Sequence, residues 1–332
     1  MTMFKYIIKR LLMTIPVVLG VMLIVFFFQS VSKDDPALQI LGSGSSMEDR
    51  EAKREELGLN DPIIVQFGRY VINFVTKGDL GTSYKSNQPV TKELLARFPL
   101  TIKLALAAVG VGIVLGIPLG VWSAVKQYTA ADSIIVTLSV LMESVPNFWF
   151  ALVLISAFSV KAHLLPSVYN GSTASWVLPI VVVAFMSVAQ IVRVTRSSML
   201  ETIRQDYVRT ARAKGQTEYR IVMDHVLRNS LIPIITAIGN TIGMQLGGAL
   251  IVESIFGMPG IGKYAVDAIS ARNYPAVLGS VVVLAITFTL VNLIVDLTYA
   301  FVDPKVKTSL ITDQAAKAQR RAMRRKEAQA NG

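Results

Sequence analysis

Several polar side chains that can bind a ligand or carry charge interrupt long apolar stretches of this sequence. Glu143 precedes Ser144-Val145-Pro146-Asn147, where the proline predicts a kink in the stretch, and Gln190 and Gln245 lie in two other apolar stretches. Charged and amide groups at membrane depth are costly to bury, and they typically face a polar pathway. Their alternative role is to join neighbouring helices through hydrogen bonds. The candidates for a polar pathway are Glu143, Asn147, Gln190 and Gln245.

Two further carboxylates lie at or near the end of apolar stretches. Glu253 directly follows one such stretch, and Asp296 lies close to the end of the last one. A carboxylate in that position needs hydrogen-bond donors or a cation, because an unpaired buried charge is strongly unfavourable. We predict a structural or gating role for both, with an inner-end arginine such as Arg193 as a partner for Asp296.

One glycine-rich stretch, Gly257-Met-Pro-Gly-Ile-Gly-Lys-Tyr264, nearly matches a phosphate-binding P-loop. Its last residue is Tyr, which does not place a short hydroxyl on Mg²⁺, and the sequence predicts no β-strand before it. We therefore predict no nucleotide site in this chain. Any ATP and Mg²⁺ that drive the protein would be bound by another subunit.

The composition excludes several other classes of chemistry. The sequence has no Cys and two His, at positions 163 and 225, which excludes thiolate sites and histidine-rich metal centres. No His-Glu-x-x-His or Gly-x-Ser-x-Gly motif occurs, so an intramembrane hydrolase has little support. We predict a protein that is not an enzyme and that holds no cofactor or metal of its own.

The elements that must position these residues are membrane spans. The 332 residues are 52% hydrophobic and 17% charged, whereas soluble domains have about a quarter of charged residues. Six apolar segments approach or exceed the ~20 residues that cross a bilayer, and helices are the default there. These segments are roughly Leu11–Ser30, Leu104–Val125, Ser133–Val160, Ser175–Val192, Leu231–Val252 and Ala276–Val302.

The distribution of basic residues predicts the orientation. With the N-terminus inside, the inside segments hold 20 Lys and Arg and the outside segments 12. Nine of those 12 lie in the long first loop, which counts little in the positive-inside rule. We therefore predict that both termini are cytoplasmic. The net charge of +11 then faces anionic lipid, and no nucleic acid partner is needed.

The chain divides into four regions on this reading. The first segment follows three basic residues as a signal peptide would, but its length and the lack of a cleavage site favour a retained anchor. The regions are 1–30, an anchor helix; 31–99, an outer region with short helices; 100–302, a five-helix core with a cytoplasmic coupling loop at 193–230; and 303–332, a basic cytoplasmic tail.

Two patterns within these regions predict local structure. In the outer region, residues 48–57 predict a charged helix that ends at Gly58, and 62–75 an amphipathic helix on the membrane surface or the protein rim. Two spans carry glycines at four-residue spacing, which lets helices approach closely in lipid. These glycines are Gly112, Gly116 and Gly120 in the second span and Gly239, Gly243 and Gly247 in the fifth.

The most charged internal loop, Tyr207 to Pro233, lies between two apolar spans on the predicted inside face. Ala211, Ala213 and Gly215 present a small surface, flanked by several basic residues. A short helix with a small face can dock in a groove of a partner while its basic residues contact acidic ones. The alternative is a solvated amphipathic loop.

This loop resembles the coupling segment of binding-protein-dependent ABC importer permeases. Their general pattern is Glu-Ala-Ala, three residues, Gly, nine residues and Ile-x-Leu-Pro. Gly215 matches the Gly, whereas Arg209-Thr210-Ala211 keeps only the last Ala, and His225-Val226-Leu227-Arg228 keeps only the Leu. These departures agree with the peptide-importer branch, which is typified by YVRTARAKG followed by HxLRNxLIP.

The resemblance continues along nearly the whole chain. It is similar to the first permease subunit of dipeptide and oligopeptide transporters in the segments FKYIIKRLLMTIPVVLGV, GDLGTSY, VESIFG, RNYP and DPK. The tail beyond about Thr308 resembles an extension outside the family pattern. Nickel and glutathione importers share this branch, so the motifs leave the cargo open.

The resemblance implies a fold, a location and a set of partners. The fold would be the six-helix, MetI-like type I ABC importer permease, in a bacterial cytoplasmic (inner) membrane. Its partners would be a second homologous permease, two cytoplasmic ATPases, an extracytoplasmic binding protein, membrane lipid and a peptide substrate. The residues expected to couple to the ATPases are Tyr207, Arg209, Thr210, Ala211, Ala213, Gly215 and Glu218.

One further class remains open on the residues alone. Six spans with Glu143 in the third and paired glycine faces also fit a self-sufficient secondary transporter or channel. Such a protein would transport its substrate alone, driven by an ion gradient. The docking-type loop and the resemblance favour the ABC permease.

Overall fold

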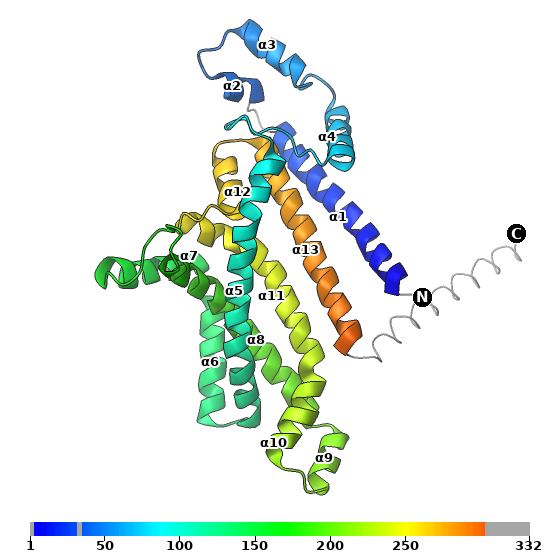
Figure 1. The fold of residues 1–332 in the computed structure, drawn as a ribbon, viewed down its shortest axis with the longest axis vertical. Coiled ribbons are helices and arrows are strands. Elements are labelled where there is room, and N and C mark those ends of the chain that lie inside the picture. Colours follow the sequence, from blue (N-terminus) through cyan, green and yellow to red (C-terminus); the bar gives the residue numbers. More distant parts are fainter. Residues whose placement is uncertain (1–2, 32–34, 303–332) are drawn as a thin grey trace, which may run out of the picture.

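A computed structural model describes residues 3–31 and 35–302 of the chain. Every regular element in this part is helical, apart from an isolated bridge between Thr82 and Pro89 (Figure 1). The predicted all-helical fold class is therefore confirmed. The elements are α1 Met3–Val31, α2 Pro36–Leu41, α3 Met47–Glu56, α4 Ile63–Lys77, α5 Val90–Val125, α6 Ala130–Ser144, α7 Asn147–Leu154, η1 Ile155–Lys161, α8 Ala174–Ile203, α9 Asp206–Ala213, α10 Glu218–Arg220, η2 Ile221–Leu227, α11 Arg228–Ile255, α12 Ile261–Ser270 and α13 Tyr274–Val302.

Within the described residues, five helices are long and apolar enough to cross a membrane, and a bent pair provides a sixth crossing if it forms one span. The helices extend beyond the predicted apolar segments. For example, α5 begins at Val90 and α8 ends at Ile203, whereas the sequence predicted Leu104 and Val192. Hydropathy marks only the part of a helix that faces lipid, while backbone hydrogen bonding continues into the polar flanks.

The predicted third span is broken. Helix α6 ends at Ser144, Val145 is extended with φ −86° and ψ 121°, and Pro146 precedes α7. A proline disfavours a helical residue before it and has no amide hydrogen to continue the helix. The axes on the two sides differ by 99°, so α7 and η1 turn away from the bundle (Figure 1). The kink predicted at Pro146 is confirmed, and it divides the predicted third span into two helical segments.

The centre of the bundle is the contact between α5 and α8, where all three predicted glycines of α5 face α8. A Cβ on Gly116 would lie 2.9 Å from Ile191, and one on Gly120 would lie 2.6 Å from the Thr195 Cβ. Gly112 approaches Ser187 in the same way. Without side chains at these positions, the two backbones pack closely, as the spacing predicted.

The second glycine set is only partly at a helix contact. A Cβ on Gly239 would overlap with Val295 of α13, and one on Gly243 would lie 2.6 Å from Phe288 of the same helix. A Cβ on Gly247 would have no described atom within 4 Å, so this glycine is not at a helix contact within the described residues. The approach of α11 to α13 ends one turn before that glycine.

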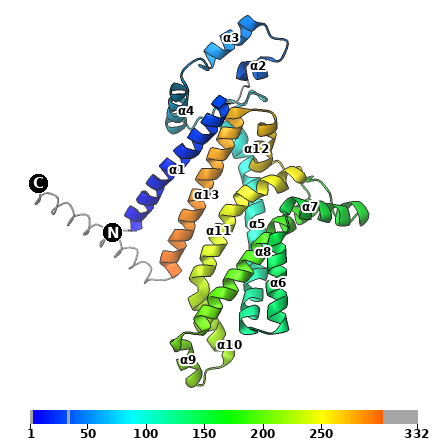
Figure 2. The same cartoon turned by 180° about the vertical axis from the view of Figure 1, so that it is seen from behind.

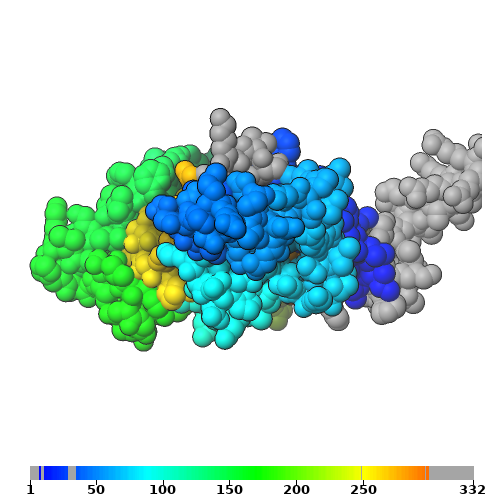
Figure 3. All heavy atoms as spheres, turned by 90° about the horizontal axis from the view of Figure 1, so that it is seen from above, coloured from blue at the N-terminus to red at the C-terminus, as the bar shows by residue number. Residues whose placement is uncertain are grey.

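The outer region forms the short helices that the sequence predicted. Helix α3 is followed by Gly58 at φ +63°, and α4 ends at Gly78, a left-handed C-cap. Helix α4 packs on the outer end of α1, where Phe26 contacts Phe67 and Tyr70. From above, the outer region and the start of α5 cover the end of the bundle, and the segment around α7 extends to one side (Figure 3).

The predicted anchor is helix α1, which packs against α13 as well as α4. Its retention in the mature protein stays a prediction. The basic tail, predicted at 303–332, lies outside the described residues.

We predict that Gly120→Ala lowers the thermal unfolding midpoint of the detergent-purified chain, because its Cβ would meet Thr195 and the Val192 carbonyl. Overpacking of this kind costs about 1–3 kcal/mol. The matched control is Gly110→Ala on the same helix, where nothing lies within 4 Å. Equal midpoints for the two variants would show that α5 and α8 are not held by this close approach.

Candidate translocation and coupling site

The predicted coupling segment is a compact turn of three short helices at one end of the bundle. It leaves α8 after Ile203, forms α9, α10 and η2, and continues into α11 (Figure 2). Between α9 and α10, Gly215 has φ +76°, in the left-handed region that glycine tolerates best. The coupling pattern therefore has a glycine at this position because the turn requires a backbone conformation that other residues adopt only with strain.

Apolar contacts hold α9 against the bundle. Val208 is fully buried and Ala211 is 6% exposed, in one cluster with Met199 of α8 and with Ile221 and Val226 of η2. Ala211, which the sequence grouped with the small outer surface, thus faces inward. Its side chain contributes to the attachment of α9 to α8 and η2.

Polar contacts close the turn on its other side. The Arg212 guanidinium donates to both carboxylate oxygens of Glu218, at 2.7 and 3.2 Å, and this contact raises the pKa of Arg212. The His225 ring lies 2.7 Å from the side-chain oxygen of Gln216. Glu218 therefore stabilises the turn. Sequence reasoning missed Arg212, Gln216 and His225 as partners, because their spacings of six and nine residues do not fit one helix.

The surface left for a partner is basic and aromatic. Arg209 contacts Asp206 only at 3.8 Å, with side chains 75% and 98% exposed. Thr210 donates its hydroxyl to the Asp206 carbonyl four residues back in the same helix. The exposed residues of this coupling surface include Tyr207, Arg209, Ala213, Lys214 and Tyr219, together with the acidic Asp206 and Glu218.

Two arginine–carboxylate pairs join α8 to α6. Glu143, one of the pathway candidates, accepts a hydrogen bond from Arg193 Nη1 at 2.5 Å. The side chains of Glu143 and Arg193 are 24% and 58% exposed. The structure thus pairs Arg193 with Glu143, whereas the sequence suggested Asp296, whose side chain lies outside what the structure describes.

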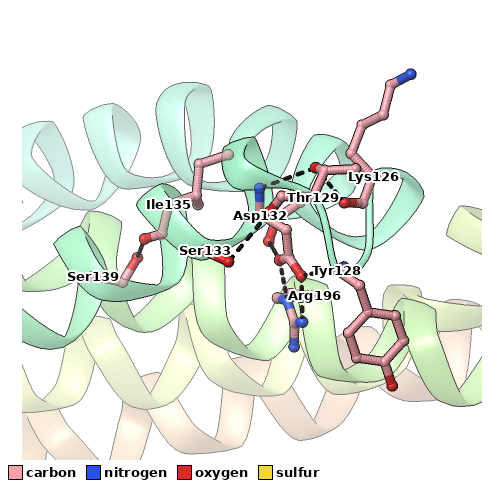
Figure 4. Close-up of polar contacts among 9 residues, drawn as sticks. Lys126, Tyr128, Thr129, Asp132, Ser133, Ile135, Ser139 and Arg196 are labelled. Atoms are coloured by element: carbon pink, nitrogen blue, oxygen red, sulfur yellow. Dashed lines mark hydrogen bonds and ion pairs between the residues drawn. The ribbon is translucent and has the colours of Figure 1, made fainter.

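The second pair, Asp132 and Arg196, was not singled out from the sequence. Arg196 donates from Nε and Nη2 to the two Asp132 oxygens, at 2.7 and 2.8 Å. Ser123 of α5 donates its hydroxyl to the same carboxylate at 2.5 Å, and the Tyr128 amide donates at 3.0 Å. Tyr128 has φ +65°, and its ring points away from the cluster (Figure 4). The sequence feature that could have pointed to this cluster is Thr129, a helix-capping residue at the start of α6 whose side chain accepts from the Asp132 amide.

The amide candidates join helices. Gln190 accepts a hydrogen bond from the Thr241 hydroxyl of α11 at 3.1 Å. Gln245 is 5% exposed and donates to the Val183 carbonyl and to Ser187 of α8, at 2.9 and 2.8 Å. Asn147 begins α7, and its side-chain oxygen is buried without a hydrogen-bond partner among the described residues. The structure therefore places Gln245 between helices, as in the alternative interpretation, and its pathway role stays a prediction.

Glu253 is fully buried near the C-terminal end of α11. Thr101 of α5 donates to one carboxylate oxygen at 2.7 Å, and the Lys263 amide donates to the other at 3.1 Å. The Thr101 oxygen also accepts the Ile261 amide at 2.9 Å. The carboxylate thus lies at the N-terminus of α12, where amide groups and the helix dipole favour an anion.

The P-loop-like glycines have their explanation here. A Cβ on Gly260 or Gly262 would overlap with the Glu253 carboxylate. The glycine-rich turn therefore surrounds an anion, as a P-loop does, but the anion is the protein's own side chain. This arrangement supports a structural role for Glu253 in holding α5, α11 and α12 together.

A second polar cluster lies beside it at the outer end of the bundle. The Tyr264 hydroxyl donates to Glu93 at 2.5 Å, and the Arg97 guanidinium lies 4.4 Å from the centre of the Tyr264 ring. Burial, followed by the hydrogen bond to Glu93, raises the pKa of Tyr264. A cavity of about 340 Å³ borders these residues together with Asp267 and Asn273. No spacing of these residues in the sequence predicts this cluster.

Sequence families match most of the chain. The family described as "Binding-protein-dependent transport system inner membrane component" matches residues 116–308, and its N-terminal companion, "Binding-prot-dependent transport system membrane comp, N-term", matches residues 3–105.

Curated relatives match along nearly their full length. The chain is 39% identical to the oligopeptide transport system permease protein AppB of Bacillus subtilis, over 92% of this chain and 100% of the relative. It is 37% identical to the dipeptide transport system permease protein DppB of Escherichia coli, over 92% and 99%. A putative peptide transport system permease protein of Brucella abortus is 38% identical, over 91% and 98%.

Solved structures show the same fold at low identity. A chain of the MetNI methionine ABC transporter in an inward-facing conformation aligns with a TM-score of 0.53 and 21% identity, covering 65% of this chain and 99% of that chain. An amino acid ABC transporter with histidines gives 0.52 and 16%, covering 63% and 93%. The MetI-like permease fold is thereby confirmed.

We predict that Thr101→Val lowers the unfolding midpoint and speeds hydrogen exchange at the Ile261 amide. The variant removes the donor to Glu253 and the acceptor for Ile261, and a buried unsatisfied group costs about 1–3 kcal/mol. The control is Thr287→Val, a buried threonine whose described hydrogen bond, to the Val283 carbonyl, lies within its own helix. A midpoint for Thr101→Val as high as that of the control would contradict the role given to the Glu253 cluster.

Proposed function

The chain belongs to the family of binding-protein-dependent transport system inner membrane components, and from this premise we propose that it is a permease subunit of an ATP-driven importer of di- and oligopeptides. The observation that supports peptides as the substrate is the match to peptide permeases over 91% or more of this chain. The family's members are membrane permeases and not ATPases, so the transport energy comes from other subunits.

The remaining parts of the transporter follow from the same premise. A second homologous permease would complete the pathway, two cytoplasmic ATPases would bind ATP and Mg²⁺, and an extracytoplasmic binding protein would deliver the peptide. Both termini and the coupling segment would face the cytoplasm, with the chain embedded in the lipid of a bacterial inner membrane. The bias of Lys and Arg to one side of the spans supports this orientation.

The coupling segment is the proposed contact for one ATPase. Its exposed surface carries Tyr207, Arg209 and Lys214, while Val208 and Ala211 attach it to α8 and η2. Aromatic and arginine side chains dominate the binding energy of many protein interfaces. Movement of an ATPase would therefore be transmitted to α8 and α11 through buried apolar contacts.

The proposed pathway uses Glu143, Asn147 and Gln190, with Gln245 contributing in a conformation in which α8 and α11 separate. Glu253 and the outer polar cluster would hold the extracytoplasmic end. Helices α5, α8 and α11 extend from that end toward the coupling segment (Figure 2).

We predict that vesicles with the complete transporter take up dipeptide only with ATP and binding protein present, and that vesicles with this chain alone take up none. Radiolabelled dipeptide uptake, with and without an imposed ion gradient, checks the prediction. Uptake by the lone chain on an ion gradient would contradict the proposed function and support a secondary transporter.

We also predict that Arg209→Glu weakens co-purification of the ATPases at least tenfold while the unfolding midpoint stays unchanged, because Arg209 is exposed and has only a distant ion pair. Gly215 is less suitable for this test, since its φ of +76° makes a substituted residue strained. The same charge change at exposed Lys92, on the outer end of α5, is the control. Equal ATPase recovery from both variants would count against docking at this surface.

A further inference from the structure

The inner half of α8 leaves a polar face uncovered by the described chain. From Gln190 to the C-cap of α8, the exposed side chains are all polar; we call them the polar face, and they are Arg193, Ser197, Glu201 and Arg204. In the outer half of the same helix, the exposed large side chains are instead Val177 and Val181. The spacing of four, four and three residues places the polar face on one side of the helix.

The contacts of α8 show which way the polar face points. Gly112, Gly116 and Gly120 bring α5 against one side of α8. Arg193 reaches α6 at Glu143, and Gln190 bonds to Thr241 of α11. The polar face therefore lies between α6 and α11, on the side of α8 away from α5, which is the side seen in Figure 2.

Such a face is unsuited to lipid. Glu143 lies within the predicted third span, and its partner Arg193 directly follows the predicted fourth span. Charged groups at this depth are strongly unfavourable in hydrocarbon and are found facing water or protein. In a permease whose pathway is completed by a second subunit, the polar face fits a water-filled wall of that pathway. This step rests on the proposed function.

The two ion pairs between α6 and α8 differ in how firmly they are held. Asp132 is 5% exposed and receives donors from Arg196, Ser123 and the Tyr128 amide. Glu143 receives one hydrogen bond from Arg193, whose side chain is 58% exposed. An exposed, singly bonded pair contributes little stability, so exchange of its partners costs little. The Asp132 pair is therefore held by more donors and is less exposed than the Glu143 pair.

A free peptide has the charges that match such an exchange. Its α-amino group has a pKa of about 7.7–8.0 and its α-carboxyl group one of about 3.3–3.7, so near neutral pH it carries both charges. We propose that Glu143 and Arg193 separate during transport and bind the two termini of the peptide, Glu143 the ammonium and Arg193 the carboxylate. Both contacts are charge-assisted hydrogen bonds, which are stronger than neutral ones. The pair would thus select peptides with free termini.

The experiment compares a dipeptide with its N-acetylated and C-amidated forms, in vesicles that hold the complete transporter and a binding protein able to bind all three. The measured quantity is the ratio of uptake rates, free over blocked, at limiting concentration. Every permease variant uses the same binding protein, so the binding protein's own selection cancels when a variant is compared with the wild type.

We predict that Glu143→Gln lowers the free-to-acetylated ratio about tenfold and leaves the free-to-amide ratio near its wild-type value. Arg193→Gln should do the reverse, because it removes the partner of the carboxylate. Tenfold corresponds to about 1.4 kcal/mol, at the lower end for a hydrogen bond to a charged group. If a single variant assembles poorly, Glu143→Gln combined with Arg193→Gln removes both charges, so that neither helix keeps an unpaired charge, and should lower both ratios.

The matched control is Asp132→Asn, at the less exposed pair between the same two helices. It should lower the unfolding midpoint and slow the uptake of all three peptides equally, leaving both ratios unchanged. Wild-type ratios in both the Glu143→Gln and Arg193→Gln variants would overturn the inference and leave the pair as a link between α6 and α8. Absence of ATP-dependent uptake of the free dipeptide by the wild-type complex would instead overturn the proposed function, and this inference with it.

Discussion

The close approach of α5 and α8 is the contact on which the rest of the bundle depends. It requires three glycines one turn apart, because a side chain at any of them would meet Ser187, Ile191 or Thr195. In lipid, apolar burial alone gives little reason for helices to associate, so backbone-to-backbone packing must supply much of the attraction. Helix α5 then carries polar contacts at both ends: Thr101 binds Glu253 at the outer end, and Ser123 binds Asp132 at the inner end.

This arrangement relates the two ends of the molecule. The coupling segment attaches to α8 through Met199 and Val208, and α8 attaches to α5 through the glycines. Helix α5 in turn binds the Glu253 carboxylate, which lies at the start of α12. The packed contacts thus form one continuous series from α9 through α8 and α5 to α12. A displacement of α9 is either opposed by this series or transmitted along it. Proteins with close-packed contacts of this kind shift between discrete arrangements rather than deform gradually.

The sequence predicted the features that depend on local pattern. Glycine spacing predicted the α5 packing face, Pro146 predicted an interruption of the third span, and Gly58 predicted the end of α3. It could not predict which charges pair, because the register of α6 against α8 is set by tertiary packing. The pairing of Arg193 with Glu143 is one such case. The bend of 99° at Pro146 likewise depends on what surrounds the break, since a proline alone permits many angles.

The near match to a P-loop shows why a motif and its chemistry must be separated. Glycines at 260 and 262 serve the same physical purpose as in a phosphate site, since they let an anion approach backbone amides at a helix N-terminus. The glycine motif therefore correctly indicates a place where an anion is bound. It does not indicate that this anion is the phosphate of a nucleotide. Glu253 occupies that place, so the site cannot exchange its anion with solvent. By the same reasoning, Glu143 differs from Glu253 in accessibility and donor number rather than in residue type, and this difference separates a fixed structural carboxylate from one that can change its partner.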